Sequence, residues 1–275
     1  MSDDDAAPAG RLLVCATPIG NLEDVTPRVL EALRSAAVVA CEDTRHTRVL
    51  LQRYGIATPT ISLHEHNEAQ RSAELLGRVR AGEVVALVSD AGMPVVSDPG
   101  GRLVAAFRDA GIRVEALPGP SAPVTAIATA GITAERWRFV GFLPRRTGET
   151  LELLRDPDVT VAFESPRRLV ATLRAIADED PTRVVAVCRE LTKLHEEVVR
   201  GPAAEVAERF ADGAVKGEIT LVVAGVAATL DVARALAAAR RLVDDGARPR
   251  TAARVVSELT GVAANELYRA LHDAD

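Results

Sequence analysis

Residues 84–100 read VVALVSDAGMPVVSDPG, an apolar run followed at once by a long loop rich in Gly and Pro. Residues 84–89 have the length and composition of a buried strand, and a helix-like segment at 101–110 follows the loop. A buried strand that leads through a glycine-rich loop into a helix is typical of an α/β fold with a parallel sheet. Such sheets bind their ligands in loops at the carboxyl ends of the strands. We therefore expect a binding loop at 88–100.

The alternation of strand and helix extends in both directions from this segment. Strands are predicted at 11–16, 37–41 and 112–116, and helices at 26–35, 44–54, 68–81 and after Ser121. Beyond a break near 131–135, strands are predicted at 137–143, 159–163, 183–187 and 219–224, and helices at 166–176 and 203–211. Helices alone are predicted at 232–243, 251–259 and 264–271. The expected organisation is a disordered tail at 1–10, an N-terminal α/β domain at 11–132, a second α/β domain at 133–227 and a helical C-terminal appendage at 228–275.

The composition is that of a soluble globular protein, with 48% hydrophobic and 26% charged residues among 275. No apolar run approaches the roughly 20 residues of a membrane span. The acidic N-terminus lacks the pattern of a signal peptide, so we expect a cytoplasmic protein that does not enter a membrane. The net charge of −6 argues against indiscriminate binding of nucleic acid, although arginines gather at 136–146 and 240–254.

Neither a metal site nor a disulfide is predicted. Cys15, Cys41 and Cys188 lie far apart in apolar segments without the spacing of a zinc site, so buried free thiols are expected. His64 and His66 would face the same side of a strand, as a pair of metal ligands does. No third ligand follows them at a recognisable spacing, and a metal is therefore not expected.

Three loops share the same chemistry. ATPIGNLEDVTP at 16–27, VSDAGMPVVSDPG at 88–100 and LPGPSAPVTA at 117–126 each place Gly and Pro after a predicted strand, where the backbone can approach a ligand closely. No GxGxxG follows the first strand, and no GxxxxGK followed by Ser or Thr occurs, which counts against NAD-dependent oxidoreductases and P-loop NTPases. Tight strand–helix connections that bind nothing are the alternative for each loop.

Several motifs occur in a fixed order along the chain. They are CEDTR at 41–45, SDAGMP at 89–94, PGPSA at 118–122, ESPRR at 164–168 and RELTK at 189–193 with HEE at 195–197. In this combination the chain resembles the tetrapyrrole methylase superfamily, and within it the ribosomal RNA small subunit methyltransferase I branch. The resemblance runs from Leu12 to Gly225, about four fifths of the chain. Met93 departs from the Thr of the family pattern, which removes one hydrogen-bonding hydroxyl from the expected donor site.

The resemblance implies two α/β domains of the tetrapyrrole-methylase type with the methyl donor, S-adenosylmethionine, in the cleft between them. It also implies a homodimer that 2′-O-methylates a cytidine in 16S rRNA of the small ribosomal subunit. Carried over position by position, the donor-binding residues are Asp90, Gly92, Met93, Val96, Ser121, Ala122, Ala126, Phe163, Glu164 and Gly217. Pro18 and Gly20 border the acceptor side of the cleft. For Asp90 the alternative is a helix N-cap, a frequent use of Asp after a strand.

Methylation of a ribose hydroxyl requires alignment of oxygen, methyl carbon and sulfur, and removal of a proton from a weakly acidic alcohol. Charged residues are concentrated directly after the strand at 183–187. We therefore expect Lys193 or Glu190 to lower the cost of deprotonating the hydroxyl, with a surface network of ion pairs as the alternative. Contacts with RNA are expected from Arg45, Arg48, His64, His66, Arg145, Arg167 and Arg168, for each of which a solvated side chain is the alternative.

Two other functions remain open at this point. One is methylation of a corrin or porphyrin precursor, against which CEDTR, RELTK and the C-terminal helices speak. The other is a ribosome assembly factor that binds the donor without turnover. The arginines of the C-terminal helices suit a contact with RNA. The apolar stripe of Val256, Leu259, Val262 and Leu267 is expected to lie in a core.

Overall fold

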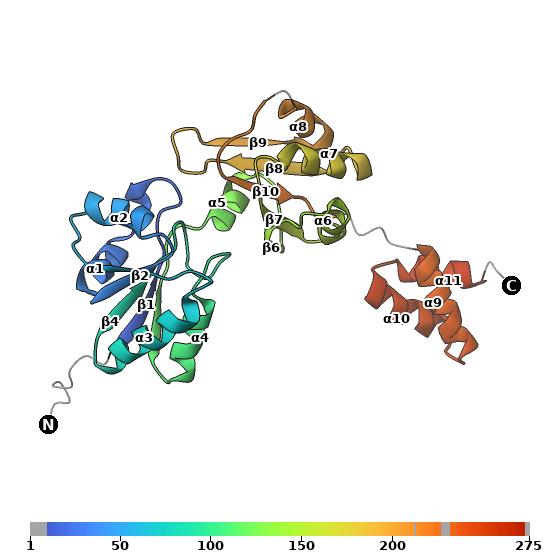
Figure 1. Ribbon diagram of the computed structural model, residues 1–275. Helices are drawn as coiled ribbons and strands as arrows, with labels where there is room; N and C mark the ends of the chain where they lie inside the picture. The colour runs from blue at the N-terminus through green and yellow to red at the C-terminus, as the bar shows by residue number, and fades with distance from the viewer. Residues whose placement is uncertain (1–9, 212, 227–231, 273–275) are drawn as a thin grey trace. The chain divides into compact units, whose positions relative to one another are not determined.

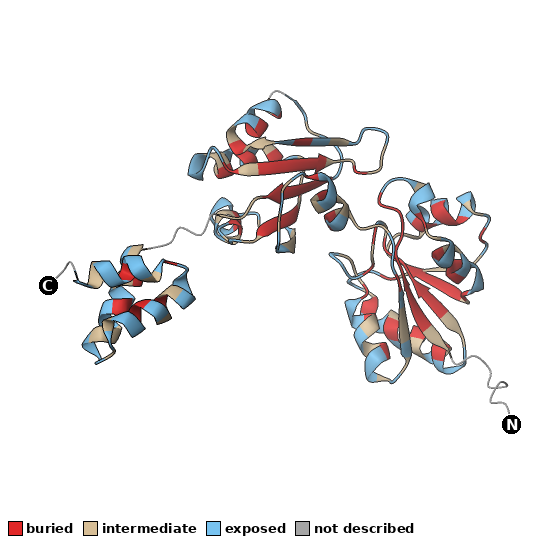
Figure 2. Cartoon of the chain, turned by 180° about the vertical axis from the view of Figure 1, so that it is seen from behind, coloured by how far each residue is buried: buried red, intermediate tan, exposed pale blue. Residues whose placement is uncertain are grey.

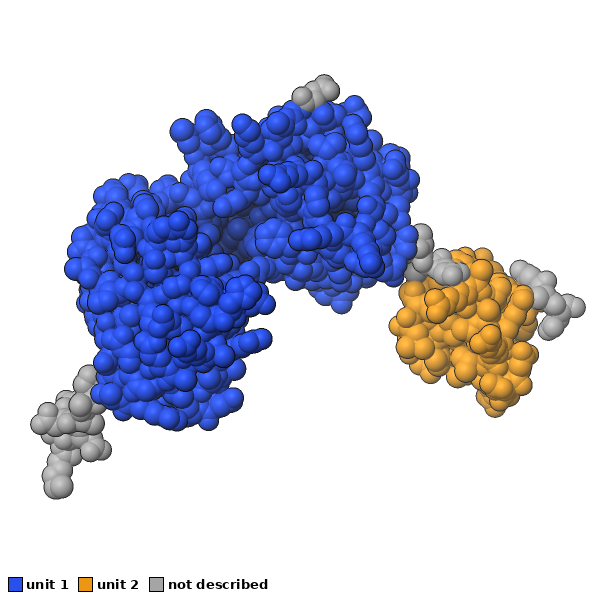
Figure 3. All heavy atoms as spheres, viewed as in Figure 1, with its two compact units in different colours: residues 1–225 blue, residues 226–275 orange. Residues whose placement is uncertain are grey.

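The computed structural model describes residues 10–211, 213–226 and 232–272. The chain divides into two compact units, residues 1–225 and 226–275, which are coloured separately in Figure 3. Apart from Gly10, the tail expected at 1–10 lies outside the described residues. The domain boundaries expected at 132 and 227 stay predictions.

The first unit begins with a parallel sheet. Its strands are β1 (Arg11–Cys15), β2 (Val38–Cys41), β3 (Thr60–Ser62), β4 (Val84–Leu87) and β5 (Arg113–Leu117), in the order β3-β2-β4-β1-β5. All the pairs in it are parallel. Helices α1 (Pro27–Ser35) and α2 (Thr44–Arg53) cover one face, and α3 (Glu68–Arg80) and α4 (Gly101–Asp109) cover the other (Figure 1).

Strand periodicity explains how this sheet fills both faces. Leu13 and Cys15 of β1 point into the core beneath α1 and α2, whereas Leu12 and Val14 point into the core beneath α3 and α4. Because both faces are covered, the central strands β1, β2 and β4 are largely apolar and appear as buried bands in Figure 2, whereas the edge strands β3 and β5 are less buried. The helix α1 begins as its sequence predicts, since the Thr26 hydroxyl accepts a hydrogen bond from the Val29 backbone N–H.

The order of strands creates a crevice at one place in this sheet. Strands β1 and β4 are neighbours, yet the helices that follow them, α1 and α4, lie on opposite faces. The two loops therefore diverge and leave an opening at the carboxyl ends of the strands, the usual ligand position in open α/β sheets. The loops are tied together at the base of the opening, where Thr17 and Gly92 exchange two backbone hydrogen bonds of 2.8 and 3.0 Å.

A second sheet of mixed direction follows in the same unit. Its strands are β6 (Trp137–Phe142), β7 (Val159–Glu164), β8 (Val184–Arg189), β9 (Glu197–Pro202) and β10 (Ile219–Val223), in the order β6-β7-β10-β8-β9. Strand β6 pairs with β7 in parallel, and the remaining pairs are antiparallel. Helices α6 (Thr147–Leu154), α7 (Leu169–Glu179) and α8 (Ala203–Arg209) pack on one face of it.

Helix α5 (Ala122–Thr129) covers the opposite face of this second sheet. Its Ala126 is fully buried against Val161 of β7 and Val222 of β10, and Ile19 from the first loop joins the same core. The small side chains of α5 allow the helix to approach the strands closely. In packing, α5 thus goes with the second sheet although it precedes the break near 131–135.

The second unit consists of α9 (Val232–Asp244), α10 (Pro249–Thr260) and α11 (Ala264–His272) around a small core of Ala, Val and Leu. Val256, Val262 and Leu267 are buried there as expected, but Leu259 is 81% exposed, so its place in the predicted stripe is wrong. The buried residues of α10 are Ala252, Ala253 and Val256, and Leu259 lies off the side of the helix that faces the core. None of the helices among the described residues has the length and apolarity to cross a membrane.

The α/β fold class, with two sheets and a helical C-terminal segment, is confirmed. The short strand β3, the edge strand β9, the helix α6 and the 3-10 turn Leu22–Asp24 were not predicted. Cys15, Cys41 and Cys188 are free and buried, as expected.

Candidate functional site

A cavity of about 420 Å³ lies in the first unit, between the loops of the first sheet and the strand ends along one side of the second sheet. Its second wall is formed where the ends of β7 and β8 meet the beginning of β10, since Ile219 pairs with both Glu164 and Arg189. The lining residues are Ile19, Ala91, Gly92, Met93, Val96, Ser97, Asp98, Ser121, Ala122, Pro123, Phe142, Phe163, Glu164, Ser165, Pro166, Cys188, Leu191, Gly217, Glu218, Ile219 and Thr220.

This cavity gathers most of the residues predicted to bind a donor. Gly92, Met93, Val96, Ser121, Ala122, Phe163, Glu164 and Gly217 all line it. Ala126 does not, because it is fully buried in the core between α5 and the second sheet. The wall is largely apolar with a few polar groups, which suits a small organic ligand.

Asp90 lies in a second cavity, of about 340 Å³, that adjoins the first. Its carboxylate accepts a hydrogen bond of 3.1 Å from the backbone N–H of Asp43. The alternative interpretation of Asp90 as the N-cap of the following helix is wrong, since Gly100 occupies that position before α4. Pro18, Gly20 and Lys193 also line the second cavity, so the residues expected on the acceptor side come together there.

The two cavities share part of their walls. Ile19, Ala91 and Glu218 line both of them. Ile19 and Ala91 come from the loops that diverge between β1 and β4, so the shared wall stands at the crevice of the first sheet. Two ligands bound in these cavities would therefore lie next to each other, at the place that these three residues line on both sides.

Lys193 bonds two carboxylates. Its Nζ lies 2.8 Å from Glu190 Oε1 and 3.1 Å from Glu218 Oε2. Burial lowers the pKa of Lys193, but its hydrogen bonds to Glu190 and Glu218 outweigh burial and raise the pKa above the ordinary lysine value. The hydrogen bond from Lys193, with a second from the Glu218 backbone, lowers the pKa of Glu190. Both groups are charged near neutral pH, and Lys193 supplies a fixed positive charge rather than a proton acceptor.

The loop that carries Glu190 and Lys193 is held by unusually close contacts. Glu190 and Thr192 adopt positive φ angles of 52° and 65°, which non-glycine residues rarely do. A Cβ at Gly217 would lie 2.6 Å from the Glu190 side chain, and a Cβ at Gly20 would lie 2.4 Å from Cγ of Lys193. The Asn21 backbone N–H donates to the Thr192 hydroxyl at 3.0 Å. The first loop and this loop thus fit only because glycine stands at both contacts.

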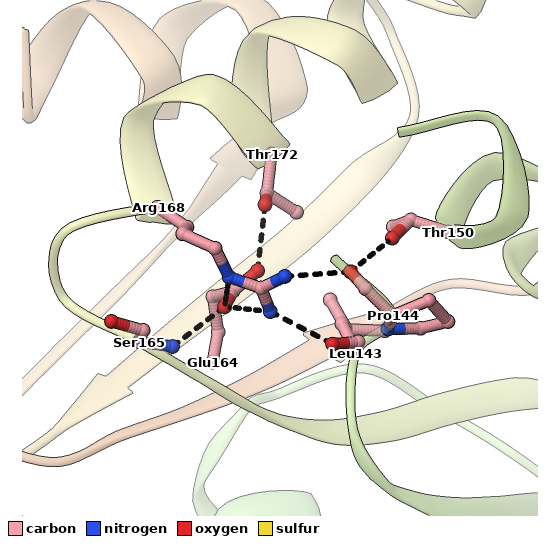
Figure 4. Close-up of polar contacts among 7 residues, drawn as sticks. All are labelled: Leu143, Pro144, Thr150, Glu164, Ser165, Arg168 and Thr172. Carbon is pink, nitrogen blue, oxygen red and sulfur yellow. Dashed lines mark hydrogen bonds and ion pairs between the residues drawn. The ribbon is translucent and has the colours of Figure 1, made fainter. Parts of the chain in front are cut away.

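Glu164 and Arg168 form a polar network at the end of β7, drawn in Figure 4. Glu164 is only 2% exposed, and its carboxylate accepts from the Arg168 guanidinium at 2.5 and 2.9 Å and from the Thr172 hydroxyl at 2.6 Å. Arg168 also donates to the carbonyls of Leu143 and Pro144 at 2.8 and 2.6 Å. These bonds occupy the guanidinium, so Arg168 holds the cavity wall together instead of projecting toward RNA.

Asp98 lines the first cavity and was missed from the sequence. Burial, together with the neighbouring Glu42 and Asp90 carboxylates, raises the pKa of Asp98 to about 6. Residues 97–98 repeat the Ser-Asp pair of 89–90, and this repetition is the signal that a second carboxylate serves the loop. No local pattern tells which of the two aspartates turns into which cavity.

The other residues expected to contact RNA are exposed and lie outside both cavities. Arg45 is bound to Asp43 at 2.7 Å, whereas Arg48, Arg145 and Arg167 have no ion pair within the described part of the chain. The rings of His64 and His66 are 6.1 Å apart. Among the described residues, no group of three or more His, Cys, Asp or Glu side chains is placed to hold a metal ion.

Known proteins resemble this chain in sequence over most of its length. The sequence model of the family described as Tetrapyrrole (Corrin/Porphyrin) Methylases matches residues 11–207. The ribosomal RNA small subunit methyltransferase I of Mycobacterium tuberculosis is 45% identical over 271 residues, which are 96% of this chain and 95% of that protein. The protein of the same name from Thermotoga maritima is 45% identical over 219 residues, 78% of this chain and 99% of that one.

Solved structures extend the likeness at the level of the fold. The uroporphyrin-III-C-methyltransferase of Thermus thermophilus superposes with a TM-score of 0.55 at 23% identity, over 78% of this chain and 94% of that one. The family match spans most of the first unit, and the curated relatives share close to half of their residues with this chain over nearly its full length. The chain belongs to the tetrapyrrole methylases and, within them, to the ribosomal RNA small subunit methyltransferase I family.

Proposed function

We propose that this protein transfers a methyl group from S-adenosylmethionine to the 2′-hydroxyl of a cytidine in 16S rRNA. The single observation that carries the proposal is the pair of adjoining cavities that share Ile19, Ala91 and Glu218. Methyl transfer needs the donor methyl group and the acceptor oxygen in line and in contact, and two adjoining cavities that share lining residues can hold donor and acceptor side by side. The relatives that match nearly the whole chain are named for ribosomal RNA of the small subunit, which supports RNA as the acceptor.

The first cavity is the donor site in this proposal. Its volume of about 420 Å³ falls within the range of small-ligand sites. Gly92, Ser121 and Ala122 leave room beside the backbone, and Met93 and Phe163 supply apolar surface. The donor supplies an activated methyl group on a positively charged sulfur. The residues of the chain orient the donor and exclude water from it.

The second cavity receives the acceptor ribose. Its charged lining groups include Asp90, Lys193 and Glu218, with His46 at its edge. The ammonium of Lys193 stabilises negative charge that develops on the attacking oxygen, because its raised pKa keeps it protonated. The hydroxyl proton passes to one of the two carboxylates that line this cavity, Asp90 or Glu218. Of the two residues expected to lower the cost of deprotonation, Lys193 acts by its charge in this proposal, and Glu190 fixes the position of Lys193 at 2.8 Å.

The wider setting belongs to the same proposal. We infer that the substrate is 16S rRNA within the small ribosomal subunit, that the enzyme acts as a homodimer and that it works in the cytoplasm. Exposed Arg45, Arg48, His64, His66, Arg145 and Arg167 are the proposed contacts with RNA. They can neutralise phosphates locally on a chain whose net charge is −6.

The test is transfer of labelled methyl from S-adenosylmethionine to unmodified small subunits, followed by alkaline digestion of the RNA. Alkali cleaves RNA through its 2′-hydroxyl, so label in an alkali-resistant dinucleotide identifies 2′-O-methylation. Label in a mononucleotide would place the methyl on a base instead. Transfer to a porphyrin or corrin precursor and not to RNA would contradict the proposal.

A lysine pair provides the matched control. We expect Lys193→Met to lower kcat about 100-fold, the usual size of the loss of one electrostatic or proton-transfer group, with the donor dissociation constant little changed. Lys216→Met removes an exposed lysine whose side chain makes no hydrogen bond or ion pair among the described residues, and should leave kcat unchanged. Equal losses in both variants would show that the charge of Lys193 has no special role.

A further inference from the structure

Asp98 is carried into the donor cavity by a strained segment of backbone. Val95 and Ser97 have φ angles of 76° and 66°. A positive φ at a β-branched residue such as Val95 is a genuine outlier. Such backbone strain persists only where the surrounding structure enforces it, and it is concentrated at functional sites. Gly141 of β6 packs against this segment so closely that a Cβ there would lie 3.3 Å from the Ser97 hydroxyl.

The charges that face Asp98 are negative. Glu42, after β2, and Asp90, after β4, both act on its carboxyl, and Ser89 offers it a hydroxyl. Glu68 of α3 lies behind the same loop, where its carboxylate accepts from the backbone N–H groups of Gly100, Arg102 and Leu103. The other carboxylates of the cavity wall are already paired, Glu164 with Arg168 and Glu218 with Lys193. Among the described residues, Asp98 has no cationic partner.

A carboxyl in such a place responds to the charge of its ligand. Burial and like charge raise the pKa of Asp98 to about 6, so a large fraction of the carboxyl holds its proton in mildly acidic solution. A cation bound in the same cavity favours the ionised carboxylate and lowers that pKa. By linkage, the cation then binds more tightly at a pH where the proton is already lost. A neutral ligand of the same shape lacks this coupling.

We propose that Asp98 is the residue by which the donor cavity distinguishes the positively charged donor from its neutral thioether product. This inference rests on the proposed function, since it takes S-adenosylmethionine as the donor. In mildly acidic solution, where a large fraction of Asp98 is protonated, binding of the sulfonium releases that proton. Methyl transfer breaks the carbon–sulfur bond, forms the carbon–oxygen bond, leaves its electron pair on sulfur and frees the hydroxyl proton. With the positive charge gone, Asp98 takes a proton back in the same pH range and no longer attracts a cation, so the product is held less firmly and leaves.

Isothermal titration of the full-length protein with S-adenosylmethionine and with S-adenosylhomocysteine tests this role from about pH 5 to about pH 8. The two ligands carry the same amino and carboxyl groups, so the ratio of their dissociation constants isolates the sulfonium charge. We expect the preference for S-adenosylmethionine to rise about tenfold across this range, as a shift of about one pKa unit on binding requires. Titrations in two buffers of different ionisation enthalpy should show proton release with S-adenosylmethionine alone.

Two variants sharpen the test. Asp98→Asn keeps the shape of the side chain and should make the preference independent of pH. Glu42→Gln removes a neighbouring charge but does not line the cavity, and should move the midpoint of the rise to lower pH. If Asp98→Asn does not fold, Glu42→Gln still decides the question, because proton release that persists in Glu42→Gln with a lower midpoint does not come from Glu42.

The outcomes separate the two levels of inference. Equal pH dependence for both ligands, or a pH-dependent preference that survives Asp98→Asn, would overturn the role of Asp98. In either case the protein still binds both ligands, and the proposed function stands. If neither ligand binds at any pH, the proposed function itself fails.

Discussion

Single glycines decide how closely the two halves of the site approach each other. Gly217 has a φ of 91°, and any side chain there would meet both a strained backbone and the Glu190 carboxylate. Gly20 makes the corresponding contact with Lys193 from the first loop. At both positions the absence of a Cβ is what allows the charged loop to reach the cavities.

Gly217→Ala is expected to destabilise the protein by about 2 kcal/mol and to weaken donor binding, because it adds steric overlap to an unfavourable φ. Denaturant unfolding and donor titration measure the two effects. Gly82→Ala is the matched control, since Gly82 has nearly the same φ of 93° but nothing within 4 Å of a Cβ. A loss of donor affinity in Gly82→Ala as large as that in Gly217→Ala would refute the role of close contact.

The two aspartates of the same loop show where local patterns stop being informative. Asp90 and Asp98 both follow a serine in a loop after β4. The sequence indicated Asp90 for the donor, whereas the structure places Asp98 on the wall of the first cavity and Asp90 on that of the second. The Asp98 side chain follows the turns at Val95 and Ser97, whose positive φ angles no residue preference would suggest.

At the scale of elements, the junction of β7 and α7 is built around one buried carboxylate. Arg168 links Glu164 to the carbonyls of Leu143 and Pro144, which follow β6. It therefore joins two segments that are separate in sequence, the stretch after β6 and the turn between β7 and α7. Arg167, its neighbour, is exposed and takes no part in the network.

Arg168→Met is expected to lower the free energy of unfolding by about 3 kcal/mol or more, because it leaves the buried Glu164 carboxylate without its partner. Arg167→Met should change the free energy of unfolding by no more than about 0.5 kcal/mol, as is usual at exposed positions. The double variant Glu164→Gln with Arg168→Met should recover part of the loss, since no buried charge then remains. Similar values for Arg167→Met and Arg168→Met would contradict the structural role.

The elements that could be predicted are those whose burial pattern is written in their own residues. The apolar strands β1, β4 and β10 and the capped helix α1 were located to within one or two residues. Strand β9 (EVVRGP) escaped because it lies at a sheet edge, where charged and exposed residues are tolerated. The three residues of β3 are too few for a pattern. The antiparallel pairing of β10 depends on distant partners, which no local periodicity reveals.

At the scale of the whole molecule, both cavities lie in residues 1–225, and the helical unit contributes no lining residue among those described. The Thermotoga maritima relative matches over 219 residues that are 99% of its own length, so a chain of that size carries the same name. The helical unit holds Arg240, Arg241, Arg248, Arg250 and Arg254. We therefore expect residues 1–225 to be sufficient for donor binding and methyl transfer, and the helical unit to contribute to affinity for RNA.

A chain ending at Gly225 is expected to bind S-adenosylmethionine with an affinity within about twofold of the full chain, since both cavities are lined by residues of the first unit. Its binding to rRNA should weaken, with a smaller dependence on salt, because each lost phosphate contact lowers the slope by about 0.9 or less. Titrations at several salt concentrations measure this change. An unaltered salt slope would show that the arginines of the helical unit do not meet phosphates.

The packing of helix α5 bears on where genes for such proteins can recombine without loss of the fold. It follows the last strand of the first sheet, yet packs on β7 and β10 of the second. Recombination at the break near 131–135 would combine α5 from one parent protein with the second sheet from the other. The side chains of that helix would not match the sheet on which it must pack. A crossover just before Ser121 would keep helix and sheet together. The segment that can be exchanged as a unit therefore begins at α5, and we expect past recombination events just before that helix.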